Sequence, residues 1–299
     1  MNSPEIDLPG QVKALQGLQE RLAGLAEEVW RASPFPESAA EPGPDVSTRL
    51  ATGRCLMPDA PSPSPAAAEL AARRLGELLE EALPQQRDEL RSLRERLVDG
   101  DPVALVNLVL GDHARELLAR IHAAKLPEDL AIFYAVLLGR PFRAWFAARL
   151  KSRVPPEAWS AGNCPICGHW PSLSLLDGKE EGRRYLWCLQ CGTHWRHPRL
   201  RCAFCGNEDQ ALLTHHQIDG QEGYRLQGCR VCKRYLKEFR SLEARDQVPW
   251  DAVYLGTAEL DLAALSLDLM RESPLIDHHG RGTPLGGVAA PAPEHTATA

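Results

Sequence analysis

The sequence predicts an α+β protein in which a mainly helical N-terminal domain is followed by two small four-cysteine modules and a C-terminal helix. Three observations predict this fold. Leucine and alanine recur at helical spacing through the first half of the chain. Eight of the nine cysteines lie within 164–232, as four Cys-x-x-Cys pairs. A further helical stripe of leucines follows these pairs, over 258–270.

Composition sets the class of protein. The chain has 299 residues, of which 44% are hydrophobic and 25% charged, and its formal net charge is −6. These are globular values, and the acidic balance speaks against a general nucleic-acid binder. The longest apolar run, about 131–139, is too short to span a membrane, and the first residues lack a secretory signal. We therefore expect a cytoplasmic protein without membrane insertion, in which disulfides are rare.

The first 65 residues predict one helix and one irregular segment. Apolar residues recur every three or four positions from Leu15 to Val29, which predicts an N-terminal helix within 1–32. Residues 33–65 are rich in proline, serine and alanine. Because proline removes a backbone donor, we expect this segment to be an irregular linker or a loosely docked strap.

The helical domain is predicted over 66–154. Asp101 is expected to cap a helix that begins at Pro102. Pro141 is expected to end the helix that contains the longest apolar run, with a further short helix after it. The connections are short, which favours an antiparallel bundle.

The remaining boundaries follow from the cysteines and prolines. Pro155 and Pro156 form a natural hinge, because the residue before a proline is pushed out of the helical region. We place the first module at 155–198, the second at 199–248 and the C-terminal helix at 249–276. The last residues, 277–299, are rich in glycine, alanine, proline and threonine, which predicts a disordered tail.

The spacing of the cysteine pairs predicts two metal sites. Twenty residues separate the first two pairs, ten the middle two and twenty-three the last two. A stretch of about twenty residues fits a hairpin that brings two pairs together, as in tetrathiolate ribbons. The first predicted site is formed by Cys164, Cys167, Cys188 and Cys191, and the second by Cys202, Cys205, Cys229 and Cys232.

An internal repeat supports this grouping. The two modules begin with CPICG and CAFCG, offset by 38 residues, and an aromatic-containing strand leads into the second pair of each. Gly168, Gly192 and Gly206 follow three of the pairs, where a sharp turn favours glycine, whereas Lys233 follows the fourth. Each module is too small to bury a sufficient core, so we expect its folding to depend on its metal.

Other uses of the cysteines remain open. Thiol–disulfide chemistry usually employs a single Cys-x-x-Cys pair at a helix N-terminus, and structural disulfides conflict with the expected compartment. Tetrahedral sulfur sites suit both iron and zinc. Nearby histidines, among them His169, His194 and His197, are interpreted as surface or supporting residues because all eight cysteines are present.

The cysteine region resembles the FdhE family of formate dehydrogenase accessory proteins. The similarity lies in CPICG at Cys164, RYLWCLQCGTHW ending at Trp195, RCAFCGN at Arg201, CRVCKRYLK at Cys229 and DLAALSLDLM at Asp261. The resemblance implies tandem rubredoxin-like modules that favour iron, with zinc as the alternative. It also implies a cytoplasmic assembly factor that binds the catalytic subunit of a respiratory formate dehydrogenase before export by the twin-arginine route.

The residues themselves indicate a binding protein rather than an enzyme. The sequence contains no P-loop, dinucleotide-binding glycine pattern, GxSxG or HExxH motif. Arginine and aromatic residues cluster in the first module, which is typical of partner-binding surfaces. The candidate partner-binding residues are Arg183, Arg184, Tyr185, Trp195 and Arg196.

The same cluster leaves alternatives open. It can be a solvated ribbon face with its aromatics packed on the cysteine turns, or part of a zinc-ribbon nucleic-acid-binding protein. A third hypothesis, from the rubredoxin likeness, is a small electron carrier.

Overall fold

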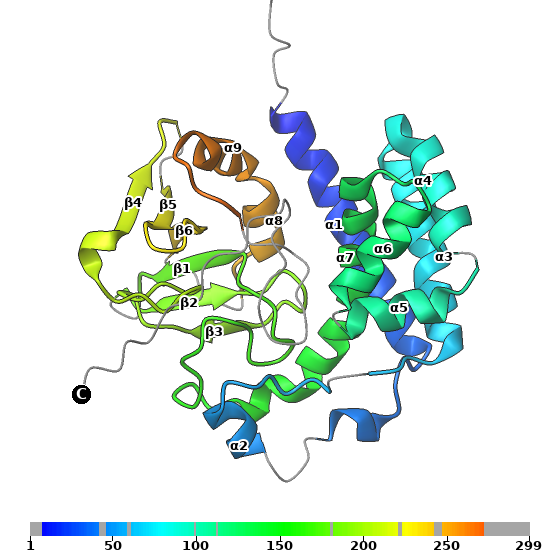
Figure 1. The fold of residues 1–299 in the computed structure, drawn as a ribbon, viewed down its shortest axis with the longest axis horizontal. Helices are drawn as coiled ribbons and strands as arrows, with labels where there is room; N and C mark the ends of the chain where they lie inside the picture. The colour runs from blue at the N-terminus through cyan, green and yellow to red at the C-terminus, as the bar shows by residue number, and fades with distance from the viewer. Residues whose placement is uncertain are drawn as a thin grey trace, which may run out of the picture.

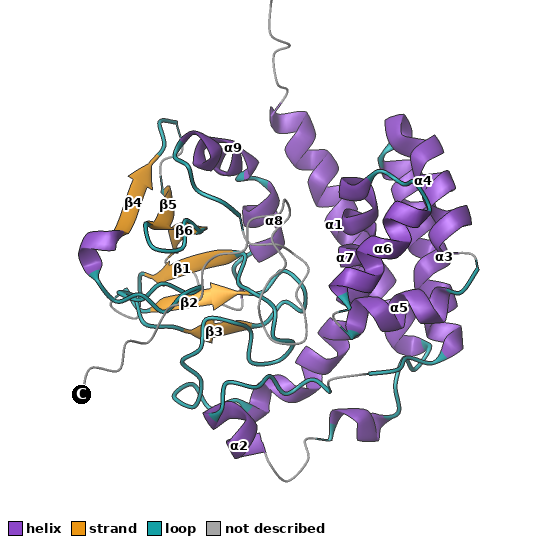
Figure 2. Cartoon of the chain, in the orientation of Figure 1, coloured by secondary structure: helices purple, strands orange, loops and turns teal. Residues whose placement is uncertain are grey.

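The structure, a computed structural model, has a helical half and a sheet half that pack against each other (Figure 1). The sheet half also holds the last two helices, so the predicted α+β class is confirmed (Figure 2). The structure describes residues 8–41, 46–58, 61–98, 100–111, 113–179, 182–220, 223–241 and 247–271. The predicted tail, 277–299, lies outside these residues.

The helical half is built from seven α-helices in the described residues, with short 3₁₀ and π turns between them. The α-helices are α1 (Leu8–Arg31), α2 (Val46–Ala51), α3 (Pro65–Ala82), α4 (Arg87–Leu93), α5 (Pro102–Leu110), α6 (Ala114–Ala123) and α7 (Glu128–Leu150). The turns are η1 (Glu37–Ala40), η2 (Pro84–Gln86), η3 (Arg94–Val98) and η4 (Lys151–Arg153).

Local sequence signals explain several helix ends. The Asp101 carboxylate accepts a hydrogen bond from the backbone N–H of Ala104 at 2.8 Å, so α5 begins where the sequence predicts. Ser64 caps α3 in the same way, with Pro65 at the first helical position. Pro84 lies in the 3₁₀ turn between α3 and α4, where its missing N–H costs no hydrogen bond inside a helix.

The expectation that Pro141 ends a helix is wrong. Helix α7 continues through it to Leu150, and Pro141 itself is buried in the helix interior. The carbonyl of Pro141 accepts a hydrogen bond from Trp30 Nε1 of α1 at 2.8 Å. A proline inside a helix costs about 3 kcal/mol, and the fully buried Phe142 and Phe146 beyond it stabilise the continued helix by a comparable amount each.

The segment 33–65 forms a strap that crosses from the helical half to the sheet half (Figure 1). Near its start, Phe35 is buried against the aromatic rings of α7. Further along, the backbone N–H groups of Leu56 and Met57 donate to the carbonyls of Pro165 and Ile166 at 2.9 and 2.8 Å. The strap is therefore anchored on the helical half at Phe35, contacts the first cysteine pair at Leu56 and Met57, and returns to its start at Ser64, whose N–H donates to the carbonyl of Pro34 at 2.7 Å.

The sheet half is one six-stranded sheet with the order β3-β2-β1-β6-β5-β4. The first module supplies β1 (Leu173–Asp177), β2 (Arg184–Trp187) and β3 (His194–Arg196), and the second supplies β4 (Leu213–Gln217), β5 (Tyr224–Cys229) and β6 (Tyr235–Ser241). Neighbouring strands within each module are antiparallel, whereas β1 and β6 join the modules as a parallel pair. The tandem modules are therefore fused through their sheets.

A buried ionic network reinforces this junction. On β6, the Glu238 carboxylate is 1% exposed and accepts hydrogen bonds from Ser174 Oγ at 3.0 Å and Arg225 Nε at 2.7 Å. Arg184 Nε donates to Ser174 Oγ at 2.9 Å. Burial lowers the pKa of the Arg184 guanidinium to about 10, while the Glu238 carboxylate opposes this shift, so Arg184 stays charged at neutral pH.

Two short helices, α8 (Trp250–Leu255) and α9 (Ala258–Ser266), occupy the region predicted as one C-terminal helix. Gly256 ends α8. The helices cover the sheet: Trp250 stacks on Trp187 of β2 with ring centroids 5.9 Å apart. Lys237 Nζ of β6 donates to the Asp261 carboxylate of α9 at 2.9 Å, which fixes α9 on the second module.

One segment, Glu128–Arg153, is long and apolar enough to cross a membrane by length and composition. In the structure 78% of its most apolar window is buried inside the protein, where α7 is the central helix of the bundle. Its hydrophobicity is thus used for packing against α1, α3, α5 and α6.

Replacing Glu238 by alanine is expected to lower the free energy of unfolding by about 3–5 kcal/mol, because it leaves the buried Arg184 charge without its partner. Urea unfolding followed by tryptophan fluorescence measures this change. A matched control is Glu157→Ala, which removes the 78%-exposed partner of Arg196 and should cost less than about 1 kcal/mol. Equal losses for the two variants would contradict a junction that depends on the buried network.

Candidate metal centres

All four Cys-x-x-Cys pairs form the same backbone turn. In each, the N–H four residues after the first cysteine donates back to the carbonyl of that cysteine, at 2.8–3.0 Å. The N–H of the first cysteine donates to the carbonyl five residues later, at 2.8–3.0 Å. The first cysteines of the turns are Cys164, Cys188, Cys202 and Cys229. The internal repeat in the sequence thus corresponds to one turn conformation that recurs at each pair. In this turn both sulfur atoms of the pair point to the same side.

The residue after the second cysteine of each pair has a positive φ. Gly168, Gly192 and Gly206 take φ values of 75–78°, which glycine adopts without steric cost. Lys233 takes φ 59° in the fourth turn, at a cost of about 1 kcal/mol. Its ammonium pairs with Asp268 at 3.1 Å and its carbonyl accepts from the N–H of Met270 at 2.7 Å, so the chain after α9 supports this strained turn.

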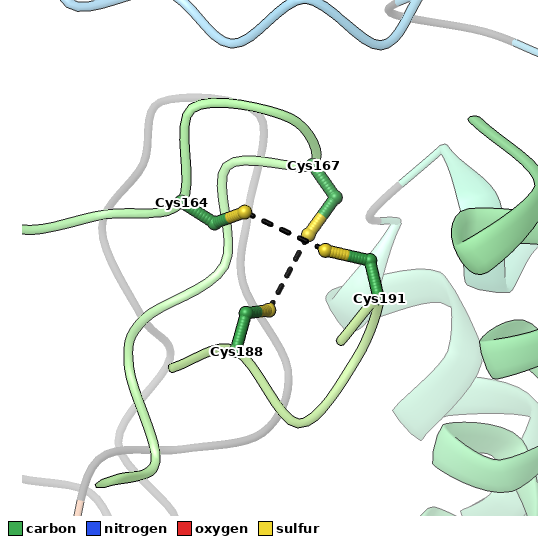
Figure 3. Close-up of side chains that lie close together, drawn as sticks. All are labelled: Cys164, Cys167, Cys188 and Cys191. Atoms are coloured by element: carbon green, nitrogen blue, oxygen red, sulfur yellow. Dashed lines mark hydrogen bonds between the residues drawn. The ribbon is translucent and has the colours of Figure 1, made fainter. Parts of the chain in front are cut away.

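The turns bring the eight cysteines together as two groups of four, with the membership that the spacing predicts: Cys164, Cys167, Cys188 and Cys191, and Cys202, Cys205, Cys229 and Cys232. Within each group the sulfur atoms all lie within 4.8 Å of one another. We call them the first and the second cluster. Figure 3 shows the four side chains of the first cluster pointing toward a common centre from two facing turns.

The sulfur distances fit a tetrahedral ion. Cys164 and Cys191 sulfurs are 3.5 Å apart in the first cluster, and Cys202 and Cys232 sulfurs are 3.7 Å apart in the second. Metal–sulfur bonds of about 2.3 Å in a tetrahedron require sulfur separations of about 3.8 Å. A disulfide requires about 2.0 Å, and all eight thiols are free. Both clusters can therefore hold a metal ion, and four sulfurs leave it no open coordination position.

The electrostatics of the first cluster favour a bound cation. Burial raises the pKa of the Cys164 and Cys167 thiols well above the ordinary value. Burial also opposes ionisation of Cys191, but hydrogen bonds with the other three thiols and with Thr193 lower its pKa well below that value. Without a bound cation, only some of the four thiols of the first cluster lose their protons readily. Because metal binding requires thiolates, it must release protons from the rest.

The first cluster is part of the largest hydrophobic core. All four of its cysteines are at most 5% exposed and belong to the same core as the buried residues of α3, α5 and α7. The strap closes one side through Leu56 and Met57. From α7, the buried Arg143 donates to the side chain of Gln190, which lies between Cys188 and Cys191, at 3.3 Å. The helical half thus encloses this cluster.

The second cluster lies at the surface. Cys202 and Cys229 are buried, but Cys205 is exposed and Cys232 is partly exposed. None of its cysteines belongs to the large core. The turn that carries Cys202 and Cys205 still contacts the first module. A Cβ atom on Gly162 would lie only 1.6 Å from the carbonyl oxygen of Ala203 in this turn. This close backbone approach requires glycine, and it holds the buried side of the second cluster against the first module.

No histidine nitrogen belongs to either cluster within the described residues. His169 and His197 are buried and make hydrogen bonds to the carbonyls of Cys167 and Pro198. Burial, with the nearby Arg184, lowers the pKa of His197 to about 3, and burial with Arg143 lowers that of His169. Both rings are therefore neutral at physiological pH and support the turns without acting as ligands.

The candidate partner-binding residues fall into two sets. Arg184, Tyr185 and Trp195 are buried, at 2%, 8% and 5% exposed, so they stabilise the first module from within. Arg183 is exposed, and Arg196 is partly exposed and pairs with Glu157 at 2.9 Å. Trp195 belongs to the large core and Tyr185 to a smaller core on the sheet, so these two aromatic side chains face the interior of the protein.

Sequence reasoning missed a cleft between the two halves. It has a volume of about 690 Å³ and lies between α1, α7, the cysteine turns and α8. Apolar residues such as Leu22, Phe133 and Val136 line its helical wall, and Trp170 and Phe204 line the opposite wall. No local sequence pattern predicts this cleft, because its walls combine several separate segments of the chain, from Leu18 in α1 to Arg271.

The polar groups in this cleft are mostly satisfied. Arg140 pairs with Asp251 at 2.6 Å, and Lys237 pairs with Asp261 at 2.9 Å. Trp170 Nε1 is a buried donor with no acceptor within the part of the chain that the structure describes. The cleft thus offers an apolar wall, together with three acidic and three basic side chains in its lining.

Cys188→Ser is expected to lower the melting temperature of the helices by about 10 °C or more, because loss of the first ion opens the core that they share. The matched control is Cys205→Ser, which breaks the second cluster and should move that temperature by less than about 3 °C. Circular dichroism at a helical wavelength gives both values on metal-loaded protein. An equal loss in both variants would show that the helices do not depend on the first cluster in particular.

Comparisons with known proteins agree with the site. The sequence profile described as "FdhE, central domain" matches residues 163–199, which contain the whole first cluster. A "Protein FdhE homolog" from Aquifex aeolicus is 30% identical over 146 residues, covering 48% of each chain. Another from Pseudomonas aeruginosa is 30% identical over 150 residues, covering 48% of this chain and 46% of the relative. The chain thus matches about half the length of these curated relatives.

A solved structure extends the similarity to most of the fold. The crystal structure of the FdhE protein from Pseudomonas aeruginosa superposes with a TM-score of 0.53, covering 87% of this chain and 91% of that one. Its sequence identity is 20%, so this match shows the fold. The central-domain match, the curated relatives and the shared fold agree with the resemblance seen in the cysteine motifs, so the chain is similar to FdhE proteins in its cysteine region and in its fold.

Proposed function

We propose that this protein is an accessory factor for the maturation of a respiratory formate dehydrogenase, and that it binds the catalytic subunit in the cytoplasm before export. The observation that carries the proposal is a pair of closed four-cysteine clusters in a chain that is similar to FdhE proteins. An ion held by four protein sulfurs has no free position for a substrate. Its role is therefore to hold the surrounding turns and helices in place.

We further propose that each cluster holds one iron ion. The sulfur distances suit a tetrahedral site in both modules, and the rubredoxin-like character of the family favours iron over zinc. The residues that hold these ions are the eight cysteines of the two clusters. The ion supplies positive charge that stabilises four thiolates, and the chain supplies the turns that orient them.

We propose that the client, the catalytic subunit of the formate dehydrogenase, binds in the cleft. Because the three acidic and three basic side chains of its lining balance in charge, an uncharged apolar segment of the client fits it better than an acidic or a basic one. Phe133, which is 38% exposed on the cleft wall, provides an aromatic contact of the kind that dominates protein interfaces.

The nucleic-acid alternative has less support. Arg184 is buried, and the side chains of Arg196 and Arg201 already pair with Glu157 and Glu208. Few arginines around the junction of the two modules are thus left to contact phosphates. Electron transfer remains a second candidate function, because the exposed Cys205 brings the second cluster to the surface, where a redox partner can approach.

Metal analysis tests the iron proposal. Protein purified without oxygen is expected to contain two iron ions per chain, because each cluster provides a complete set of four sulfurs. Controlled oxidation should then produce a red colour from sulfur-to-iron charge transfer, read by visible absorption. Cys205→Ser is the matched variant and should lose one ion. Two colourless zinc ions would contradict both the iron proposal and electron transfer.

Client binding is tested with a tagged catalytic subunit under reducing, anaerobic conditions. The wild-type protein should co-purify with it. Phe133→Asp, which places a charge on the apolar wall of the cleft, should lower the recovered complex about tenfold. The matched control is Leu262→Asp on α9, because Leu262 is 69% exposed outside the cleft.

The co-purification assay also distinguishes two candidate surfaces for the client, the cleft and the first module. Arg183→Ala alters the exposed arginine of the first module and leaves the cleft intact. A loss with Arg183→Ala but not with Phe133→Asp would place the client on the first module instead of in the cleft. Failure of the wild-type protein to co-purify would contradict the proposed function as a whole.

A further inference from the structure

The two clusters have matching turns but different surroundings. In the first cluster Cys164 and Cys188 are fully buried, and Cys167 and Cys191 are 3% and 5% exposed. In the second, the turn that carries Cys205 is open to solvent on its outer side. The sulfur separations differ by only 0.2 Å, 3.5 against 3.7 Å, so the difference lies in access rather than in the ligands.

Access decides how a closed tetrahedral site exchanges its ion. A competing ligand must reach the ion and make a fifth contact before a protein sulfur leaves, because zinc sites can expand to five ligands. Around the first cluster, the strap, α7 and the sheet occupy the approaches. The cleft borders the first cluster at Cys191, but this residue is only 5% exposed, so a competing ligand must open part of the shared core to reach the ion, which is a rare local unfolding event.

The second cluster needs no such opening. Cys205 is exposed, and the neighbouring turn between Cys229 and Cys232 presents Val231, which is 56% exposed. A small chelator can therefore approach from the solvent side while the sheet and α9 stay in place. Cys202 and Cys229, on the buried side, keep the turn positions fixed while the ion is exchanged.

We propose that the second cluster is an exchangeable binding site for thiophilic cations such as Zn²⁺, Cd²⁺ or Fe²⁺, whereas the first keeps its ion as long as the core is folded. The assignment rests on the proposed metal content of the two clusters and goes beyond it, because it gives them different roles. The first ion is structural, and the second can enter or leave the folded protein.

The test uses full-length protein loaded with two zinc ions and mixed with excess 4-(2-pyridylazo)resorcinol, whose colour reports the released metal. One ion is expected to leave in a fast phase and the other at least about tenfold more slowly, because the slow phase requires local unfolding. Cys205→Ser should lack the fast phase and keep the slow one. Release of both ions in a single phase would overturn the proposal, whereas failure to bind zinc would overturn the metal sites themselves.

A second measurement assigns the phases without a cysteine variant. Iodoacetamide added after the fast phase alkylates newly free thiols, and peptide mass spectrometry locates them. The label should appear on cysteines of the second cluster while those of the first stay protected; the reverse order would overturn the proposal. Leu56→Pro removes the N–H that holds the strap on Pro165, so it should speed only the slow phase.

Discussion

The structure depends on one constraint, which is that four sulfurs must meet around one point in each module. This constraint fixes the Cys-x-x-Cys turns, and the turns fix the strands that join them. The backbone hydrogen bonds of the four turns are nearly identical, although only three of them have the glycine that suits the positive φ. At the fourth, Lys233 keeps the same conformation because the residues after α9 hold it. The shared geometry of the cysteine turns thus prevails over a local preference of the chain.

The first cluster also organises the rest of the molecule. Its cysteines belong to the same core as α7, and the strap and Arg143 reach it from the helical half. This explains why a chain with a helical half and a metal-binding half folds without an independent boundary between them. The cleft is a consequence of that union, because it lies where α1 and α7 meet the cysteine turns and α8. A client held there would contact the helical half and both modules at once.

The parallel pairing of β1 with β6 gives the tandem repeat its asymmetry. Two modules with the same internal order are joined through the first strand of one and the last strand of the other. The junction buries Glu238 and Arg184, and the C-terminal helices then cover the sheet. The helical half packs against the first module, whereas the outer edge of the second module faces solvent. Duplicated sequences therefore end in unequal environments, which is the physical basis for assigning the two ions different roles.

The sequence by itself determined the local features, because each depends on a few neighbouring residues. Cysteine spacing predicted the membership of both clusters, Asp101 predicted a helix start, and the positive-φ turns followed from glycine. Tertiary structure decided what depends on distant segments. Packing carried α7 through Pro141, buried Arg184 and Trp195 that resembled a binding surface, and docked the strap on the first cluster. The cleft and the unequal exposure of the two clusters also depend on tertiary packing. The burial of a residue is set by the segments that pack over it and not by its neighbours in sequence.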